Sequence, residues 1–540
     1  MTDQINADVV IVGSGVVGSL SAYRLAQAGA KVVILEAGGE ITRGSAVHRW
    51  QQSTDKGANS PYPAAPHAPQ PSDNDPNSWY VNVGPVAFNG AYVRSVGGTT
   101  WHWTGFADRL RANDLQMKTK YGVGFDWPVT YEELQPWYRD AENEWGVAGY
   151  QEDAVEWGTP RTDPYPMPGV PASYLDEQVQ KAVNKLDLTV GRFSHARNSI
   201  ERDGRPPCCG NNTCQPICPI QAKYDATVHV KKAVAAGAQL VTDAVVYDIV
   251  VDASQKVTSV RFKRPDNSEG EATGKVFIIG CHAIENPRLL LMSKRDTTPN
   301  GVANSSGTVG RYLTGQVNQN TFGLTPQPVY PYRGPQQTGG ITQWRDGDFR
   351  SRFAAVGTSI MNDGWHPFFG PGIWATTFAK QGLRGEALRN AVTDHTNREF
   401  RLNSSAEMLG SPDNMIDLDP DKKDALGMPR PRVSFSYDDW TKAGLDNALK
   451  VNKQIMESIG ATEVRHDDPS VSQAIITSTA RMGTDPKNSV VDAMGKTHDH
   501  ANLYVLGTSA HVSAPINPPT LTTAALALRA AAQIKDELAG

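Results

Sequence analysis

Four of the five cysteines in this chain fall within eleven residues, in the run Pro-Cys-Cys-Gly-Asn-Asn-Thr-Cys-Gln-Pro-Ile-Cys-Pro. They are Cys208, Cys209, Cys214 and Cys218. Thiolates this close together, separated by small and turn-forming residues, suit one soft metal centre better than they suit disulfides across a fold. The spacing lacks the paired Cys-x2-Cys of a zinc ribbon, and a cysteine followed by proline is typical of iron–sulfur proteins. The run therefore favours an iron–sulfur cluster, with zinc and disulfides as the alternatives.

The number of ligands follows from the geometry of neighbouring residues. Side chains next to each other in extended chain point to opposite sides, so we expect Cys208 or Cys209, and not both, to join Cys214 and Cys218. Three ligands would suit a cluster that lacks one corner iron. The fifth cysteine, Cys281, lies in an apolar run and is expected to pack as a small buried side chain.

A glycine-rich turn near the N-terminus predicts a dinucleotide site. An apolar strand runs into Gly13, Gly15 and Gly18, a helix is expected over 19–28, and a second apolar strand ends at Glu36. In such units the first glycine makes a tight turn, the second admits a pyrophosphate, the third lets helix and strand pack, and the acid binds a ribose. The alternative is an ordinary βαβ unit, and this unit alone does not decide between FAD and NAD.

A second glycine motif over 96–105 and the C-terminal segment 502–531 complete a family pattern. With the cysteine run, they make the chain resemble the glucose-methanol-choline (GMC) oxidoreductases. Within that family it looks most like the large subunits of bacterial membrane-associated dehydrogenases of gluconate, fructose, glucose or sorbitol. The similarity runs nearly end to end. Its most specific element is the cysteine run, which in those relatives holds a 3Fe-4S cluster.

The resemblance implies FAD as the dinucleotide. It assigns the pyrophosphate and ribose to the N-terminal turn, the isoalloxazine to the second glycine motif, and the adenine to a later strand. The residues so assigned are Gly13, Gly15, Gly18, Glu36, Gly97, Gly98, Thr99 and Val246. His102 stands where some relatives attach the flavin covalently. The alternative is that its ring only packs between Trp101 and Trp103.

The catalytic positions depart from the family pattern. Alcohol oxidation needs a base for the hydroxyl proton as hydride leaves carbon. Relatives supply a histidine upstream of a Gly-Thr-x-x-Met-Gly run, and here that position is Ile475. The partner position fits Asn517, with one extra proline after it, and a family Asp-His-Pro reads Gly-Gln-Val at 315–317. Three features differ together, which indicates a branch with an altered pocket.

Two candidates for the altered chemistry remain in the sequence. His511 follows a strand that the family places near the flavin and is a candidate replacement base, or else an ordinary loop histidine. Arg481 would orient an anionic sugar acid, or else form a structural ion pair. His498 and His500 have no third ligand nearby, and are expected on a turn and not at a metal.

The predicted fold class is α/β, of the GMC type. A Rossmann-like FAD-binding domain is expected over 1–125, 222–308 and 484–540, and a discontinuous α+β substrate domain over 126–221 and 309–483. Helices are expected over 131–145, 175–186, 384–396 and 438–458. A segment dense in Pro, Ala and polar residues, 60–75, predicts an irregular excursion that serves as a lid or a subunit contact.

Composition narrows the class further. The chain has 540 residues and a formal net charge of −5, which gives no cationic footprint for nucleic acid. Apolar runs stay below the roughly 18 residues of a membrane span, and the N-terminus does not read as a signal peptide. We expect a chain that is soluble by itself. The resemblance implies a periplasmic location, export with a small signal-bearing subunit, and membrane attachment through a multihaem cytochrome c.

The predicted function is an FAD-dependent dehydrogenase acting on a hydroxyl of a sugar, sugar acid or polyol. A hydride delivers two electrons whereas haem iron accepts one at a time, so a 3Fe-4S cluster suits an external acceptor better than oxygen. Two alternatives follow from Ile475. One is a family member with altered substrate or chemistry, for example glycoside oxidation. The other is an electron-transfer subunit without catalysis.

Overall fold

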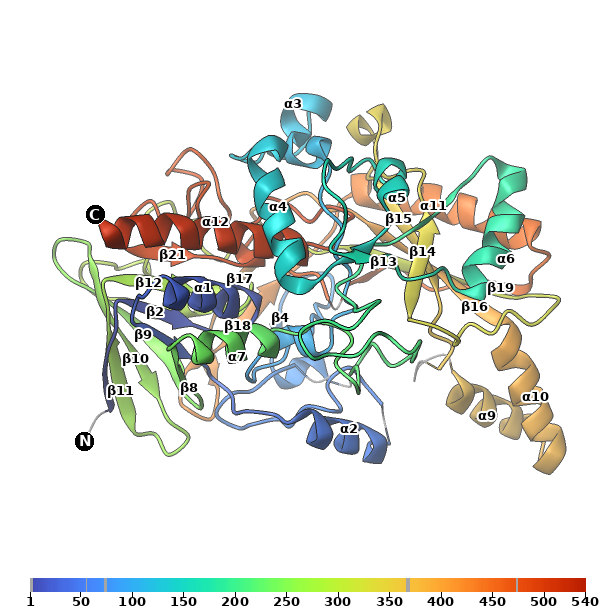
Figure 1. Ribbon diagram of the computed structural model, residues 1–540, viewed down its shortest axis with the longest axis horizontal. Helices are drawn as coiled ribbons and strands as arrows, with labels where there is room; N and C mark the ends of the chain where they lie inside the picture. Colours follow the sequence, from blue (N-terminus) through green and yellow to red (C-terminus); the bar gives the residue numbers. More distant parts are fainter. Residues whose placement is uncertain (1–2, 55, 72–74, 366–369, 473) are drawn as a thin grey trace.

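The computed structural model describes residues 3–54, 56–71, 75–365, 370–472 and 474–540 (Figure 1). The architecture is mixed α/β, as predicted, and is built around two large sheets. The first is parallel, and its strands come from near the N-terminus, from the middle of the chain and from near the C-terminus. The second is antiparallel and contains mostly residues from the middle of the chain.

The parallel sheet has the strand order β21-β12-β2-β3-β8. Its strands are β2 (Val9–Val12), β3 (Val32–Leu35), β8 (Gln239–Val241), β12 (Val276–Ile279) and β21 (Leu503–Val505). All five are three or four residues long, and β2, β3, β12 and β21 are buried at every residue. A parallel sheet covered on both faces requires such continuous apolar runs, because neither side of the strand meets water.

Helices cover one face of this sheet and a second sheet covers the other. Val9 and Ile11 of β2 share a core with α1 (Val16–Gln27), α7 (Thr227–Ala235) and α12 (Thr520–Ala539). Val10 and Val12 share a core with the sheet β1-β11-β10-β9 and with α8. Those elements are β1 (Asp3–Asn6), β9 (Val245–Val251), β10 (Val257–Lys263), β11 (Glu269–Thr273) and α8 (Glu285–Met292).

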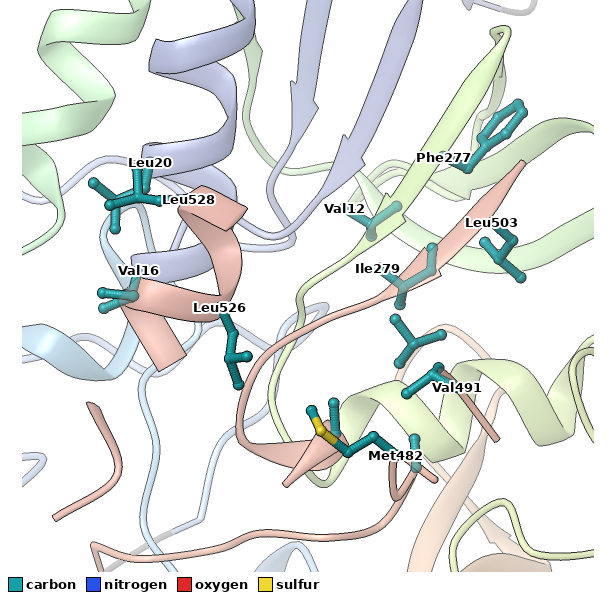
Figure 2. Packing of buried hydrophobic residues seen from close by; sticks show 14 of the residues in the cluster. Val12, Val16, Leu20, Phe277, Ile279, Met482, Val491, Leu503, Leu526 and Leu528 are labelled. Atoms are coloured by element: carbon teal, nitrogen blue, oxygen red, sulfur yellow. The ribbon is translucent and has the colours of Figure 1, made fainter. Parts of the chain in front are cut away.

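The same core joins distant parts of the chain. In Figure 2, Val12 lies near Ile279 of β12 and Leu503 of β21, with Met482 and Val491 close by. The helix α4 (Tyr131–Trp145) packs on α12, so this core also holds a segment from the first third of the chain.

The antiparallel sheet has the order β19-β13-β16-β15-β14-β7, and β20 pairs with β13 beside β19. Its strands are β7 (Val190–Arg192), β13 (Val317–Leu324), β14 (Gln337–Ile341), β15 (Val356–Met361), β16 (Glu399–Ala406), β19 (Thr462–His466) and β20 (Ser470–Val471). Apolar residues on one face pack against α6 (Tyr174–Val183) and α11 (Asp439–Ser458). The opposite face is polar, and it lines a cavity.

Smaller elements complete the fold. The short sheets contain β4 (Val81–Asn82), β17 (Met415–Lys423) and β18 (Pro429–Ser434), and β5 (Ala148–Gly149) with β6 (Met167–Pro168). The remaining helices are α2 (Arg43–Gln52), α3 (Met117–Tyr121), α5 (Gln151–Glu156), α9 (Pro371–Lys380) and α10 (Gly385–Arg398). The pair α9 and α10 projects from the body at the lower right of Figure 1.

The four helices expected from periodicity are present. Their bounds agree within two residues, except that α6 ends at Val183 and a 3-10 turn, Asn184–Leu186, carries the chain on. The first helix starts at Val16, three residues earlier than predicted, because Gly15 already serves as its N-cap. Of the expected excursion 60–75, residues 72–74 lie outside the described part. Within the described ranges, no helix has the length and apolar character needed to cross a membrane.

Candidate active site

A cavity lies at the carboxyl ends of β2, β3 and β12, where open α/β sheets bind nucleotides. We call it the dinucleotide cavity. The predicted residues that line it are Gly13, Gly15, Glu36, Gly98, Thr99 and Val246. Gly18 stands behind the wall, and a Cβ there would lie 1.8 Å from the Gly13 carbonyl oxygen. Only glycine therefore lets α1 approach the turn this closely.

Two glycine turns meet in this cavity. The Ser14 amide and hydroxyl donate to Glu36 Oε2 at 2.9 and 2.6 Å, and the Gly97 amide donates to Ser14 Oγ at 3.1 Å. Gly97 has φ +95°, and a Cβ on Gly98 would lie 3.3 Å from the Gly15 Cα. The two backbones thus form a cradle without side chains, which suits a pyrophosphate.

The predicted covalent position, His102, is not among the residues that line the cavity. Its ring is buried and meets the edge of Tyr62, with a centroid distance of 6.1 Å. Burial, with the cation of Lys223 nearby, lowers its pKa to about 4. A flavin link through His102 stays a prediction.

The sequence reasoning missed His282, which does line the dinucleotide cavity. Its ring stacks on Tyr92 at 4.4 Å, its φ is +127°, and burial lowers its pKa to about 4. Cys281 also lines the cavity. It was expected to be a buried side chain, and the structure shows it only partly buried. The available signal was position, since both residues follow a parallel strand at its carboxyl end.

A second cavity lies against the polar face of the antiparallel sheet. We call it the amide-lined cavity. Alternate residues of three strands point into it, as the two-residue period of a strand requires. They are Asn318 and Asn320 of β13, Gly357, Ser359 and Met361 of β15, and Arg401, Asn403 and Ser405 of β16.

Strand register places these side chains in rows. Asn320 is opposite Asn403, and Asn403 is opposite Ser359. The residues between them on β16, such as Leu402, face the helices. This alternation is visible in the sequence and was the signal that could have found the cavity.

The two cavities meet. Trp103, Ala474 and Thr520 line both of them. Ile475 lines the amide-lined cavity and Ile476 the dinucleotide cavity. The position at which relatives carry a base is therefore at the junction, and here it offers only a hydrocarbon side chain.

Asn517 is completely buried, between Ile516 and Pro518, which line the amide-lined cavity. Its amide nitrogen donates to the Arg109 carbonyl, and its oxygen accepts from the Arg345 guanidinium. The Gln316 amide donates to the carbonyls of Pro515 and Ile516, both at 2.8 Å. Neighbours of Asn517 line the cavity, whereas Asn517 itself is held by these partners.

His511 lies outside the lining of both cavities. It is fully buried, its Nε2 is 3.1 Å from Thr523 Oγ1, and its ring lies 5.0 Å from that of Trp127. Burial lowers its pKa to about 3. The structure thus does not bring His511 to the junction with Ile475, and a catalytic role for it stays a prediction.

Other polar candidates have structural partners. Arg481 donates to the Asn488 carbonyl, and its guanidinium lies 4.1 Å from the Phe125 ring centre, outside both cavities. His498 pairs with Ser489, and His500 with the Gln255 carbonyl. These histidines are engaged in loop structure, as expected.

The cysteine run lines a small cavity of its own, with Arg197 and Lys223. Cys214 is buried, Cys208 is partly buried and Cys209 is exposed. Burial raises the pKa of Cys208. In the part of the chain that the structure describes, no three His, Cys, Asp or Glu residues are placed to hold a single metal ion. Ligands of a cluster bind different irons and stand further apart than ligands of one ion, so the shared cavity remains compatible with a cluster.

Lys223 joins this cysteine cavity to the second glycine motif. Its ammonium donates to the carbonyls of Trp101 at 3.1 Å, Trp103 at 2.5 Å and Cys214 at 2.7 Å. The side chain is 2% exposed, and burial lowers its pKa to about 8. A cation is thus held between the cysteine loop and Trp103, which lines both large cavities.

Comparison with known proteins agrees with this architecture. The sequence profiles described as GMC oxidoreductase match residues 129–317 and 411–527, and one described as NAD(P)-binding Rossmann-like domain matches residues 11–81. The chain is 35% identical to the fructose dehydrogenase large subunit of Gluconobacter japonicus, over 99% of each chain. It is 22% identical to the gluconate 2-dehydrogenase flavoprotein of Pantoea cypripedii, over 98% of this chain and 94% of that one.

Among solved structures, that of pyridoxine 4-oxidase from Mesorbium loti superimposes with a TM-score of 0.65. The two share 19% identity, over 98% of this chain and 99% of the other. At this identity the likeness is one of fold, and it confirms the predicted fold class.

Proposed function

This chain belongs to the GMC oxidoreductase family, and from that premise we propose that it oxidises a hydroxyl of a sugar, sugar acid or polyol as a dehydrogenase. It is an FAD-dependent oxidoreductase related to the fructose and gluconate dehydrogenase subunits. The proposal concerns the substrate, the internal electron carrier and the acceptor.

The dinucleotide cavity fits FAD. The backbone cradle of Gly13, Gly15 and Gly98 would hold the pyrophosphate, and Glu36 would accept from the ribose. Val246 also lines this cavity, and the adenine would rest against it. When bound, FAD supplies the hydride acceptor of the reaction.

The observation that carries the substrate class is the amide-lined cavity at the junction. Asn320, Asn403 and Ser359 line it in one row of neutral groups, in which Asn320 donates to Asp467 and accepts from Asn403 and Arg401. Such groups match the alternating donors and acceptors of sugar hydroxyls, and Trp103 offers an apolar face beside them. The chain's own residues thus bind and orient a polyhydroxylated substrate at the mouth of the dinucleotide cavity.

We assign the cysteine cavity to a 3Fe-4S cluster held by Cys208, Cys214 and Cys218. All four cysteines of the run line this cavity, with two cations, Arg197 and Lys223, and the choice of Cys208 over Cys209 is supported by the greater exposure of Cys209. Positive charge beside thiolates offsets the negative charge of a cluster. Such a cluster carries single electrons, which favours a cytochrome or another external acceptor over oxygen.

A relative named as a large subunit supports the proposal that this chain works with partner subunits. We place this chain in the periplasm, exported with a small signal-bearing subunit and attached to the membrane through a multihaem cytochrome c. No part of this assembly involves nucleic acid.

Ile475 favours a second candidate. A hydrocarbon side chain at the junction cannot accept a proton, and Asn517 is bound by Arg109 and Arg345. A family member with altered substrate or chemistry, such as glycoside oxidation, or a subunit that only transfers electrons, is consistent with that arrangement.

The test is an anaerobic titration of the purified protein followed by its visible spectrum. Gluconate, glucose, fructose, sorbitol and a simple glycoside are added in turn. Bleaching of the flavin band by gluconate, glucose, fructose or sorbitol, followed by loss of the broad iron–sulfur absorption, is the expected result, whereas bleaching by the glycoside alone supports the second candidate. If dithionite reduces both centres and none of these compounds does, the dehydrogenase proposal is wrong and the second candidate replaces it.

A further inference from the structure

Arg345 is a buried guanidinium in the wall of the amide-lined cavity. It follows β14, is 4% exposed, and donates through Nη2 to the Asn517 side chain. Its Nε has no hydrogen-bond partner. Gly357 makes room for the group, since a Cβ there would lie 3.0 Å from Arg345 Nη1. The group is therefore fixed at one end and unsatisfied at the other.

The guanidinium of Arg345 lies over the Trp157 ring, 4.5 Å from its centre, which offsets only part of the buried charge. Among the described residues, no carboxylate forms an ion pair with it. Asp108 accepts hydrogen bonds from Ser194, and Asp114 pairs with Arg350 at 2.9 Å. Burial and the like charge of Arg111 lower the Arg345 pKa to about 9, so the side chain is still a cation at neutral pH but a costly one to bury.

The other arginine of the cavity shows the contrast. Arg401 donates to Asp363 at 2.6 Å, so its charge is already compensated. All remaining described residues in the lining are neutral. A substrate hydroxyl would give Arg345 a hydrogen bond but leave its charge buried and unpaired. A carboxylate would supply the hydrogen bonds and also the opposite charge, because its two oxygens match the guanidinium.

We propose that Arg345 binds a carboxylate of the substrate, so that the amide-lined cavity selects a sugar acid over the corresponding neutral polyol. This inference rests on the proposed function for the identity of the cavity, and it names the substrate class within it.

The test is equilibrium binding to the flavin-loaded protein, reduced with dithionite so that no turnover occurs. Gluconate and sorbitol share their carbon chain and differ in a terminal carboxylate. The native protein is expected to bind gluconate more tightly. Arg345→Gln should weaken gluconate binding roughly 10- to 100-fold, as the loss of a charged hydrogen-bonded contact does, and leave sorbitol unchanged.

Two further variants keep this test sharp. Gly357→Ala displaces the guanidinium without removing it and should also reduce the preference for gluconate, in case Arg345→Gln does not fold. Arg481→Gln removes another buried arginine, outside both cavities, and should keep the preference. Equal binding of both ligands by the native protein, or an equal loss of both in Arg345→Gln, overturns the inference.

Failure of the proposed function is separable from failure of this inference. If gluconate binds in a way that depends on Arg345 but no sugar reduces the flavin, the dehydrogenase proposal is wrong and the carboxylate site is supported. If neutral sugars are oxidised and gluconate is neither bound nor oxidised, the dehydrogenase proposal is supported and the carboxylate site is wrong.

Discussion

At the junction of the two cavities, single residues decide what chemistry is available. Ile475 occupies the position of the expected base and cannot accept a proton. The Gln316 amide holds the segment before Asn517 by hydrogen bonds to its carbonyls, and Arg345 places a cation in the cavity wall. His511, which the sequence suggested as a replacement base, is buried and hydrogen-bonded to Thr523. The side chains at this junction therefore differ from those that the family pattern implies.

The adjacent cysteines provide a matched test of the cluster. Cys208→Ser should abolish the cluster's absorption and its electron paramagnetic resonance signal, since Cys208 is the more buried of the two adjacent cysteines that line the cavity with Cys214 and Cys218. Cys209→Ser should keep both signals, because Cys209 is exposed. Loss of the cluster in the second variant and not the first would reverse the ligand assignment.

Buried histidines should make the protein acid-sensitive. Burial holds the pKa of His511 at about 3, below its ordinary value of 6.5, so the unfolded chain binds more protons between these pH values. Stability is then complete above pH 6.5 and falls as the pH decreases, by up to about 1.4 kcal/mol per pH unit for each such histidine.

Melting temperatures between pH 7.5 and 5 check this, with His511→Gln as the comparison. The variant should show a shallower decline than the native protein. Parallel curves would show that His511 does not titrate in the way its burial implies.

At the scale of elements, two features of the fold place the site. The carboxyl ends of the parallel strands open into the dinucleotide cavity, and one face of the antiparallel sheet forms the other cavity. Periodicity predicted α4 with its observed bounds, since its apolar positions repeat every three to four residues and Thr130 caps it. The polar face of β13, β15 and β16 was not predicted, because alternation alone does not say which face is covered.

Close packing of α1 on its turn yields an element-scale prediction. Gly18→Ala places a Cβ 1.8 Å from the Gly13 carbonyl oxygen, so α1 must move away from the cradle. We expect at least a tenfold loss of FAD affinity and a loss of roughly 1–3 kcal/mol in stability, as for other overpacked sites. Flavin fluorescence titration and urea unfolding measure both.

The control is Gly44→Ala in α2, where an added Cβ meets no atom within 4 Å. It should leave FAD binding unchanged, and stabilise the helix by roughly 0.5–1 kcal/mol because alanine loses less backbone entropy. If Gly18→Ala binds FAD as well as Gly44→Ala does, the close approach is not required.

Across the whole molecule, the dinucleotide cavity gathers residues from Val12 to Thr523. A ligand seated there contacts segments from both ends and from the middle of the chain. Lys223 extends the same connection to the cysteine loop through three backbone carbonyls. Binding of FAD and the stability of the whole fold should therefore be coupled.

FAD should therefore stabilise the molecule as one unit. At a free concentration of one hundred times its Kd, the ligand adds about 2.7 kcal/mol to the stability of the folded state. Calorimetry of the flavin-free and flavin-loaded protein should show one transition that moves upward as a whole. A second transition that ignores FAD would mean that the antiparallel sheet unfolds independently.

Local signals in the sequence determined the dinucleotide turn, the cysteine run, the main helices and the missing base at position 475. Each depends on residues near one another in the chain, where spacing alone carries the geometry. The tertiary structure decided which cysteine of the adjacent pair is exposed, that His511 is sealed away, and that Arg345 lies in the cavity wall beside Asn517. These depend on contacts between segments up to hundreds of residues apart, and side-chain burial and charge pairing are set only when those segments pack.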